Sequence, residues 1–388
     1  MIGVGAGPSP MTAALRASER ECWVALSLVP GIGPAGFAQL VRRHGTAAAA
    51  WTAGPNGLES IGRLGPGAKD GLATLRREGA RSVVRRLTER TAQAGGRIVT
   101  GLDDDYPVAL RTLDPRPPTL FVAGDGTALT ERAVAIVGTR RASGYGLATA
   151  TDLADELARA GIVVVSGLAL GIDGAAHRAA VNAGGRTVAV LPSPLNRVYP
   201  PRHRGLARDI VRGGGVLISE VAIGAPVGRP DFARRNRIIA GLSEAVVVVE
   251  APDRSGALLT AAAAITIGRE LYAVPGQIDA QAARGCNRLI ADHDAVIVTS
   301  VGGVLRQIGL TRDRKPPAVN TLSEVEAQVL QRLLDRSGSI EELVDRTHQP
   351  PASVASALTL LEARGLVNTF GGATFHPTLG ARRLAGVI

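Results

Sequence analysis

The sequence predicts an α/β protein built on a doubly wound, mostly parallel sheet of the extended Rossmann type, with a helical region before it and a winged helix after it. Short, continuous runs of Val, Ile, Leu and Ala recur between residues 97 and 308, and helical segments separate them. Strands that are buried on both faces of a parallel sheet show this uninterrupted pattern. The alternation of strand and helix indicates βαβ units.

The N-terminal region has a helical pattern. We expect residues 1–18 to be a disordered tail and residues 19–95 to form a helical domain of the helix-hairpin-helix type. Its main signal is Leu28-Val-Pro-Gly-Ile-Gly-Pro34, a glycine-rich turn followed by an apolar-periodic helix that runs to Arg43. Such a turn brings backbone N–H groups and a helix N-terminus close to a phosphate. A tight turn with no ligand is the alternative.

The sheet domain is expected to span residues 96–310. Its predicted helices include Gly146–Ala160 and Phe232–Leu242. Its predicted strands are Ala133–Val137, Ile162–Val165, Thr187–Leu191, Val216–Ile218, Ala245–Val249, Leu271–Val274 and Ala295–Val298.

A charged, proline-rich linker at residues 311–321 leads to a winged helix at residues 322–388. The signals are two capping boxes, a third helix and a hairpin with a two-residue glycine turn. They are Ser323-x-x-Glu326, Ser339-x-x-Glu342, Ser353–Arg364, and the strands Val367–Phe370 and Ala373–Phe375 around Gly371-Gly372. The third helix carries one basic residue, so we favour protein contact or a structural role over base reading.

The charge favours an acidic partner. The 388 residues carry a formal net charge of +10, and Lys69 and Lys315 are the only lysines. A coding bias toward arginine explains that usage, yet every other basic group is then a planar, bidentate phosphate ligand. Cys22 and Cys286 form no disulfide framework or metal spacing, and the most apolar stretch, Leu258–Ile267, is too short to span a membrane. We expect a cytoplasmic protein.

Gly, Ser and Arg residues follow the predicted strands. Because ligands of open α/β sheets bind beyond the carboxyl ends of the strands, these residues converge on one edge. Gly138, Ser166 and Gly167 leave the backbone close to an anion, and Arg140 can grip phosphate. The segment Phe232-Ala-Arg-Arg-Asn-Arg237 adds three arginines and an aromatic ring for base stacking, a combination typical of single-strand binders. The alternative is that these arginines form a solvated helix face or pair with Glu220 and Glu250.

No catalytic constellation emerges from the sequence. The chain lacks a GxGxxG fingerprint and a P-loop, and its six histidines form no metal-ligand set or nucleophile–base pair. Asp173 and His177 lie four residues apart, and we expect Asp173 to cap the helix and to hold His177. We therefore expect no catalytic residues, no metal and no cofactor.

Several motifs, in order, resemble the DNA-processing protein A family (DprA, also called Smf). The resemblance covers about residues 106–298. The motifs are Tyr106-Pro107, Ala135-Ile-Val-Gly-Thr-Arg140 with Ser143-x-Tyr-Gly146, Val165-Ser-Gly-Leu-Ala-x-Gly-Ile-Asp173, Tyr199-Pro200, Ser219-Glu220, Arg235-Asn-Arg-Ile-Ile-Ala-Gly-Leu-Ser243, Val249-Glu250 with Ser255-Gly256, and Ala273-Val-Pro-Gly276.

The resemblance implies a single-stranded DNA-binding protein that protects incoming DNA, forms a homodimer and loads the RecA recombinase during natural transformation. It also implies that the N-terminal helices are similar to a sterile-alpha-motif domain. The DNA-binding residues that it implies, together with those above, are Gly138, Arg140, Ser166, Gly167, Arg202, Phe232, Arg234, Arg235, Asn236, Arg237, Ser255 and Gly256.

Three positions depart from the family pattern. Pro192-Ser-Pro194 replaces Gly-Cys-Gly after the third strand, and Gly285-Cys-Asn287 replaces Gly-Thr-Asn. Arg234 replaces a proline and is expected to strengthen phosphate binding.

Two other functions stay open. The first is a nucleotide-hydrolysing Rossmann-like enzyme, but lysine-decarboxylase-like phosphoribohydrolases carry Pro-Gly-Gly-x-Gly-Thr where this chain has Pro275-Gly-Gln-Ile278. The second is an adaptor that acts through the winged helix.

Overall fold

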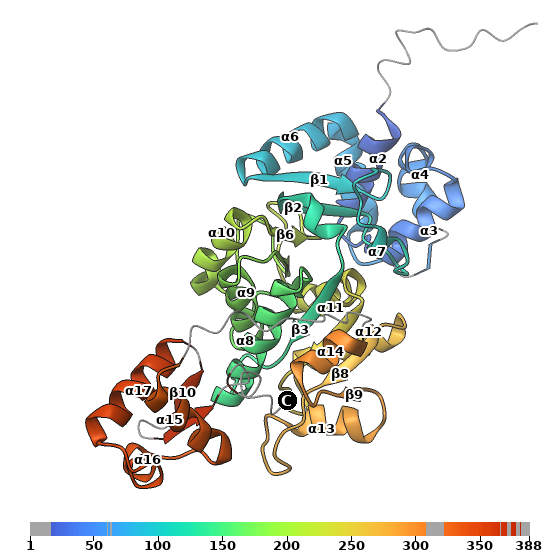
Figure 1. Cartoon of the computed structure of the whole chain (residues 1–388). Coiled ribbons are helices and arrows are strands. Elements are labelled where there is room, and N and C mark those ends of the chain that lie inside the picture. Colours follow the sequence, from blue (N-terminus) through green and yellow to red (C-terminus); the bar gives the residue numbers. More distant parts are fainter. Residues whose placement is uncertain are drawn as a thin grey trace, which may run out of the picture. The chain divides into compact units, whose positions relative to one another are not determined.

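The computed structural model describes residues 17–59, 61–62, 64–307, 322–364, 366–370, 374–377 and 381 (Figure 1). The chain forms two compact units, Met1–Thr311 and Arg312–Ile388. The predicted tail (residues 1–16 of it), the whole predicted linker (residues 311–321) and the Gly371-Gly372 turn lie outside the described residues. None of the described helices is long and apolar enough to cross a membrane.

The first unit is built on a nine-stranded sheet, in the part of the chain that the structure describes. The order is β1-β2-β6-β5-β4-β3-β7-β8-β9, and every pair from β6 to β9 is parallel. β1 pairs antiparallel with β2, and β2 with β6. The strands are β1 (Gly96–Thr100), β2 (Thr119–Gly124), β3 (Ala133–Val137), β4 (Val163–Ser166), β5 (Thr187–Leu191), β6 (Val216–Ser219), β7 (Ala245–Val248), β8 (Glu270–Ala273) and β9 (Val296–Ile297).

The prediction of a mostly parallel, doubly wound sheet is confirmed, and all seven predicted strands are present within one or two residues. Both antiparallel strands escaped the sequence analysis. β1 begins with Gly96 and Arg97, so its apolar run is only Ile98 and Val99. β2 is fully apolar from Leu120 to Ala123, but it follows two prolines, and the only helix between it and β1 is the four-residue segment Val108–Arg111.

Helices cover both faces of the sheet (Figure 1). One face packs against helices α8 (Gly144–Arg159), α9 (Ile172–Asn182) and α10 (Arg204–Arg212). The other face packs against α7 (Val108–Arg111), α11 (Arg229–Leu242), α12 (Gly256–Thr266) and α13 (Arg284–Ala291). α14 (Val301–Gln307) contacts α8, and the 3-10 turns are η2 (Gly126–Leu129) and η3 (Pro201–His203).

The chain order creates a switch point in this sheet. From β3 the chain proceeds through β4, β5 and β6 in one direction, and then returns to place β7 on the other side of β3. The loops after β3 and β7 therefore diverge to opposite faces and leave a crevice, the usual ligand position in this class of sheet.

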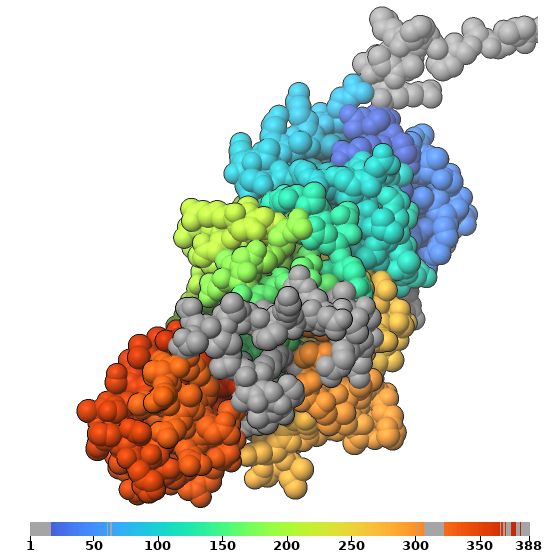
Figure 2. Space-filling model, in the orientation of Figure 1, coloured from blue at the N-terminus to red at the C-terminus, as the bar shows by residue number. Residues whose placement is uncertain are grey.

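The N-terminal helices pack directly on the sheet. They are α2 (Glu19–Ser27), α3 (Pro34–His44), α4 (Ala47–Ala53), η1 (Gly54–Leu58), α5 (Ala68–Glu78) and α6 (Ala80–Gln93). A single apolar cluster joins Trp23, Leu26 and Leu87 of these helices to Phe121 of β2 and Leu217 of β6. The space-filling view shows the blue and cyan surface of the helices continuing into the green of the sheet (Figure 2).

The predicted glycine turn connects α2 to α3. Gly31 has a φ of 79° and its carbonyl accepts a hydrogen bond from the Gly65 N–H at 2.9 Å. Gly33 precedes Pro34, the first residue of α3, and supplies no side-chain cap. The turn thus has an internal role in fixing the loop at Gly65.

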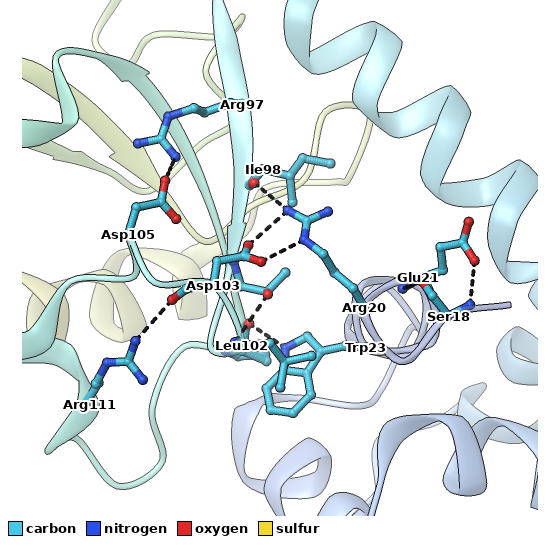
Figure 3. Close-up of polar contacts among 12 residues, drawn as sticks. Ser18, Arg20, Glu21, Trp23, Arg97, Ile98, Leu102, Asp103, Asp105 and Arg111 are labelled. Carbon is cyan, nitrogen blue, oxygen red and sulfur yellow. Dashed lines mark hydrogen bonds and ion pairs between the residues drawn. The ribbon is translucent and has the colours of Figure 1, made fainter.

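Polar contacts reinforce the packing of α2 on β1 (Figure 3). The Arg20 guanidinium donates to both carboxylate oxygens of Asp103, at 2.8 and 2.9 Å, and to the Ile98 carbonyl at 2.9 Å. The Trp23 indole donates to the Pro118 carbonyl at 2.7 Å. Burial pushes the pKa of Asp103 up, but the bonds from Arg20 and from the Thr100 N–H outweigh it and hold the pKa below its ordinary value.

The second unit has its own small core of leucine, valine and alanine side chains. Its helices are α15 (Glu324–Asp335), α16 (Ile340–Thr347) and α17 (Pro351–Ala363), and its hairpin pairs β10 (Val367–Phe370) with β11 (Thr374–Pro377). Both predicted capping boxes are present, at Ser323 and Ser339. Three helices followed by an antiparallel hairpin are the arrangement predicted for a winged helix.

We expect Asp103→Asn to destabilise the first unit by about 1 kcal/mol at pH 7, since it weakens a partly exposed bidentate pair. A carboxyl group whose pKa is lower in the folded chain stabilises the fold at pH values above its unfolded pKa of 3.8. This stabilisation is lost as the pH falls through the folded pKa. Urea unfolding should therefore show a penalty at neutral pH that shrinks in acid. Asp105→Asn is the matched control. It removes a carboxylate that pairs with Arg97 and is more exposed than Asp103, and it should change the free energy of unfolding little.

Candidate nucleic-acid interface

A hollow of about 380 Å³ lies at the switch point, beyond the carboxyl ends of β3 and β7. Four exposed arginines line it, and we call it the arginine hollow: Arg140 and Arg141 follow β3, Arg254 follows β7, and Arg229 begins α11. Within the described residues, none of these four side chains pairs with a carboxylate. Their charges are therefore available to an anionic ligand.

An aromatic pair borders the same hollow. The Phe232 ring lies edge-on to the ring of Tyr199, with 5.6 Å between centroids, and the Arg140 guanidinium lies 5.5 Å from the Phe232 centroid. A smaller hollow beside Phe232 is lined by Gly167, Leu170, Pro192 and Tyr199. A guanidinium, a partly buried ring and an exposed ring thus lie together over a short stretch of surface, as in sites that bind unpaired bases.

Arg235 and Asn236 form the floor of the arginine hollow and are both buried. The Arg235 guanidinium donates to the carbonyls of Gly167 and Val190, each at 2.6 Å, and to Asn236 Oδ1 at 3.2 Å. The Asn236 amide donates to the Gly256 carbonyl at 3.2 Å. Burial lowers the pKa of Arg235 to about 10, so it stays charged at neutral pH. These two side chains tie together the loops after β4 and β7 and the end of β5.

The glycines of the strand ends are required by packing. A Cβ on Gly167 would lie 1.9 Å from an Arg235 nitrogen, and one on Gly138 would lie 2.5 Å from the Ile172 side chain. The sequence analysis assigned both glycines to close approach of an anion. Protein atoms fill the space on the Cβ side of each glycine, which gives both a packing role, and the approach of an anion to their backbone stays a prediction.

Seven of the twelve expected DNA-binding residues line the arginine hollow: Gly138, Arg140, Phe232, Arg235, Asn236, Ser255 and Gly256. Gly167 lines the smaller hollow next to it. Ser166 lies deeper, where its hydroxyl donates to the Ile136 carbonyl at 2.6 Å. Arg202 is exposed on η3 and does not line either hollow.

Arg234 and Arg237 face a buried carboxylate instead. Arg237 donates to Glu220 at 2.7 Å and to the Pro115 carbonyl at 2.7 Å, while Arg234 pairs with Asp231 and lies 3.8 Å from Glu220. The alternative of pairing with Glu220 thus holds for these two arginines. Arg234, which replaces a proline of the family, adds no charge to the arginine hollow.

Sequence reasoning missed Arg141, Arg229 and Arg254 as members of the hollow. Arg141 and Arg254 directly adjoin predicted site residues, and Arg229 lies one helical turn before Phe232. Their positions in the sequence, after predicted strands for Arg141 and Arg254 and just before the predicted helix for Arg229, could have identified them.

The prediction that Asp173 caps a helix and holds His177 is wrong. The N-cap of α9 is Gly171, and the Asp173 carboxylate accepts from the N–H groups of Gly167 and Ala169 at 3.2 and 3.3 Å. His177 Nδ1 bonds the Thr187 hydroxyl at 2.7 Å. The carboxylate folds the loop after β4 back on itself, because that loop has two inward-facing N–H groups to satisfy.

Comparisons with known proteins agree with this geometry. A family model described as DNA recombination-mediator protein A matches residues 97–309, and one described as the DprA winged helix domain matches residues 313–373. The putative DNA processing protein DprA of Mycobacterium tuberculosis is 36% identical over 380 residues, which cover 92% of this chain and 91% of that protein. This chain belongs to the DprA/Smf family of DNA-processing proteins.

Other DprA/Smf relatives support the assignment. Protein Smf of Escherichia coli is 36% identical over 72% of this chain and 77% of its own. The crystal structure of DprA from Streptococcus pneumoniae has a TM-score of 0.63 at 28% identity, and covers 74% of this chain and 97% of that one. A Helicobacter pylori DprA structure, described as showing the single-stranded DNA binding mode of that protein, has a TM-score of 0.51 at 28% identity over 55% of this chain and 97% of that one.

We expect Arg237→Ala to act on stability. The change leaves the Glu220 carboxylate buried beside fewer donors, which costs about 3 kcal/mol when one member of a buried pair is removed. Thermal unfolding at neutral pH measures the loss. Adding Glu220→Gln to the variant should restore much of it, and a variant as stable as the parent would contradict the role assigned to this pair.

The stability of the first unit should fall between pH 7 and pH 5 because of His177. Burial, together with the nearby charges of His203 and Arg235, lowers the pKa of His177 from 6.5 to about 3, so the unfolded chain binds a proton there that the folded chain does not. The linked loss is about 2 kcal/mol over this pH range. Denaturant unfolding of His177→Gln, which keeps an amide beside Thr187, should show a correspondingly flatter profile.

Proposed function

We propose that this DprA/Smf-family protein binds single-stranded DNA in the arginine hollow and acts as a binding platform. The observation that carries the proposal is the set of four exposed arginines around Phe232 at the switch point of the sheet, none of which has a carboxylate partner among the described residues. The binding mode described for the Helicobacter pylori relative supports it.

The shape of the site favours an unpaired strand. Double-stranded DNA is read by an element that projects into a groove, whereas here the cations line a concave surface. Phosphates would contact Arg140, Arg141, Arg229 and Arg254, and a base would stack on Phe232 or Tyr199. The site residues that sequence analysis expected at Gly138, Ser255 and Gly256 would shape the wall between these contacts.

The chemistry available in the hollow supports binding without catalysis. Its titratable lining consists of arginines and Asp173, among the described residues. Asp173 is fully buried, and its carboxylate is already engaged by two N–H groups. Among the described lining residues, no nucleophile lies beside a base, and this supports the proposed binding role.

We further propose that the bound strand is delivered to the RecA recombinase, that the protein acts as a homodimer, and that it works in the cytoplasm. These proposals extend the family membership, and the sequence resemblance motivates them. The second unit, which has a core of its own, is the part of the chain that we propose for a protein contact.

Arg140→Ala should weaken oligo-dT binding by about tenfold, since a charge-assisted phosphate contact is lost. The slope of log affinity against log salt should decrease by about 0.7, the value for one phosphate of a single strand. Fluorescence anisotropy across a salt series measures both. Arg208→Ala removes an exposed arginine of α10 that lies outside the hollow and is the matched control.

Salt-independent binding, or equal losses in the two variants, would contradict the assignment of the strand to the arginine hollow. RecA nucleation on the same oligonucleotide tests the second step. Protein that binds DNA normally but leaves RecA assembly unchanged would remove the loading proposal and retain the binding proposal.

A further inference from the structure

The motif Ser143-x-Tyr-Gly146 contains two residues with clear internal roles. Ser143 caps α8, because its hydroxyl accepts from the Gly146 N–H at 3.0 Å. Its own N–H and hydroxyl donate to the two oxygens of Glu250, at 2.9 and 2.5 Å. Gly146 leaves room for that carboxylate, since a Cβ there would lie 2.4 Å from a Glu250 oxygen. The motif therefore joins the start of α8 to the end of β7.

Tyr145 has no comparable role. Its side chain is 54% exposed, and its hydroxyl reaches only the Pro275 carbonyl, at the long distance of 3.5 Å. Of the four tyrosines, Tyr106 and Tyr272 are buried, whereas Tyr145 and Tyr199 are exposed. Exposed aromatic rings beside a binding surface are suited to stacking with a flat ligand.

Tyr145 borders a second hollow, which we call the Tyr145 slot. It has a volume of about 510 Å³ and lies beyond the carboxyl ends of β7 and β8. Much of its wall is apolar, formed by Val249, Val274, Pro275, Ala280, Ala282 and Ala283. The Asn287 side chain holds both the N–H and the carbonyl of Gly276, at 3.1 and 3.0 Å, so the turn at the end of β8 is fixed before any ligand binds.

The chemistry of the slot suits a nucleobase and opposes a phosphate. Its described lining includes no arginine or lysine, and the Glu250 carboxylate belongs to it. Gln277 is exposed at its edge and offers one amide donor group and one acceptor to the rim of a base. An apolar wall, an aromatic ring and a few polar groups are the usual elements of a site for a flat heterocycle.

The slot adjoins the arginine hollow along the same edge of the sheet. Glu250 lines the slot, and its backbone carbonyl accepts from the Thr139 N–H of the arginine hollow at 2.7 Å. The small hollow at Tyr199 lies beyond β4 and β5, the arginine hollow beyond β3 and β7, and the slot beyond β7 and β8. Three sites thus follow one another in the order of the strands.

We propose that the Tyr145 slot holds a base of the same DNA strand whose phosphates lie in the arginine hollow, stacked on the Tyr145 ring. This inference rests on the proposed function, because it needs a strand in the arginine hollow. The bound strand would then cross the edge of the sheet from the ends of β4 and β5 to the end of β8.

Abasic scanning of an oligo-dT with the full chain tests the proposal. Besides any position that stacks on Phe232 or Tyr199, one further oligonucleotide position should lose about tenfold in affinity when its base is removed, which is the scale of a single base–aromatic stack. In Tyr145→Ala, the intact oligonucleotide should bind about tenfold more weakly and that same position should become insensitive to base removal. Tyr145→Phe should retain the wild-type pattern, because the ring remains.

Two further variants separate the slot from general effects. Leu147→Ala changes a 38%-exposed residue two positions along α8 that does not line the slot, and should leave every value unchanged. Ala282→Trp, which fills the slot, should reproduce the Tyr145→Ala pattern. Tight binding with an unaltered abasic profile in Tyr145→Ala would overturn the slot and leave the proposed function standing. Absence of oligonucleotide binding in the wild type would overturn both.

Discussion

The buried guanidinium of Arg235 holds together the edge of the sheet on which the proposed binding surface lies. Placing a charged group in the interior is costly unless its donors are satisfied, and Arg235 bonds two strand-end carbonyls and an amide oxygen. Asp173 supplies the opposing charge nearby, and in turn fixes the loop after β4. The loops that flank the arginine hollow are thus positioned before any ligand arrives.

This arrangement divides the arginines of one short segment between two tasks. Arg235 and Arg237 of α11 serve the interior, where carbonyl groups and Glu220 satisfy them. Arg229, at the start of the same helix, remains exposed in the hollow with Arg140, Arg141 and Arg254. Because Arg235 and Arg237 already hold the surrounding loops in place, less conformational entropy is lost when the exposed arginines bind a flexible strand.

The sequence predicted the parallel core well because strands such as Ala133–Val137 and Thr187–Leu191 are buried on both faces and have continuous apolar runs. β1 was not predicted because its apolar run is only Ile98 and Val99. In the site, the convergence of strand ends in this fold predicted one shared edge, and Arg140 and Phe232 do line one hollow there, while DNA binding by either residue stays a prediction. Residue type could not separate Arg237 from Arg229, because the partner of each arginine depends on Glu220, which lies far away in sequence, and on the face that α11 presents to it.

The shared core of the N-terminal helices and the sheet has a consequence for shortened versions of the chain. Trp23, Leu26 and Leu87 are buried against Phe121 and Leu217, so a chain that begins near residue 97 would expose a broad apolar surface of β1, β2 and β6 to water. The N-terminal helices therefore shield this apolar surface from water. A shortened chain that contains the sheet without these helices would need polar residues in place of Phe121 and Leu217 to avoid aggregation.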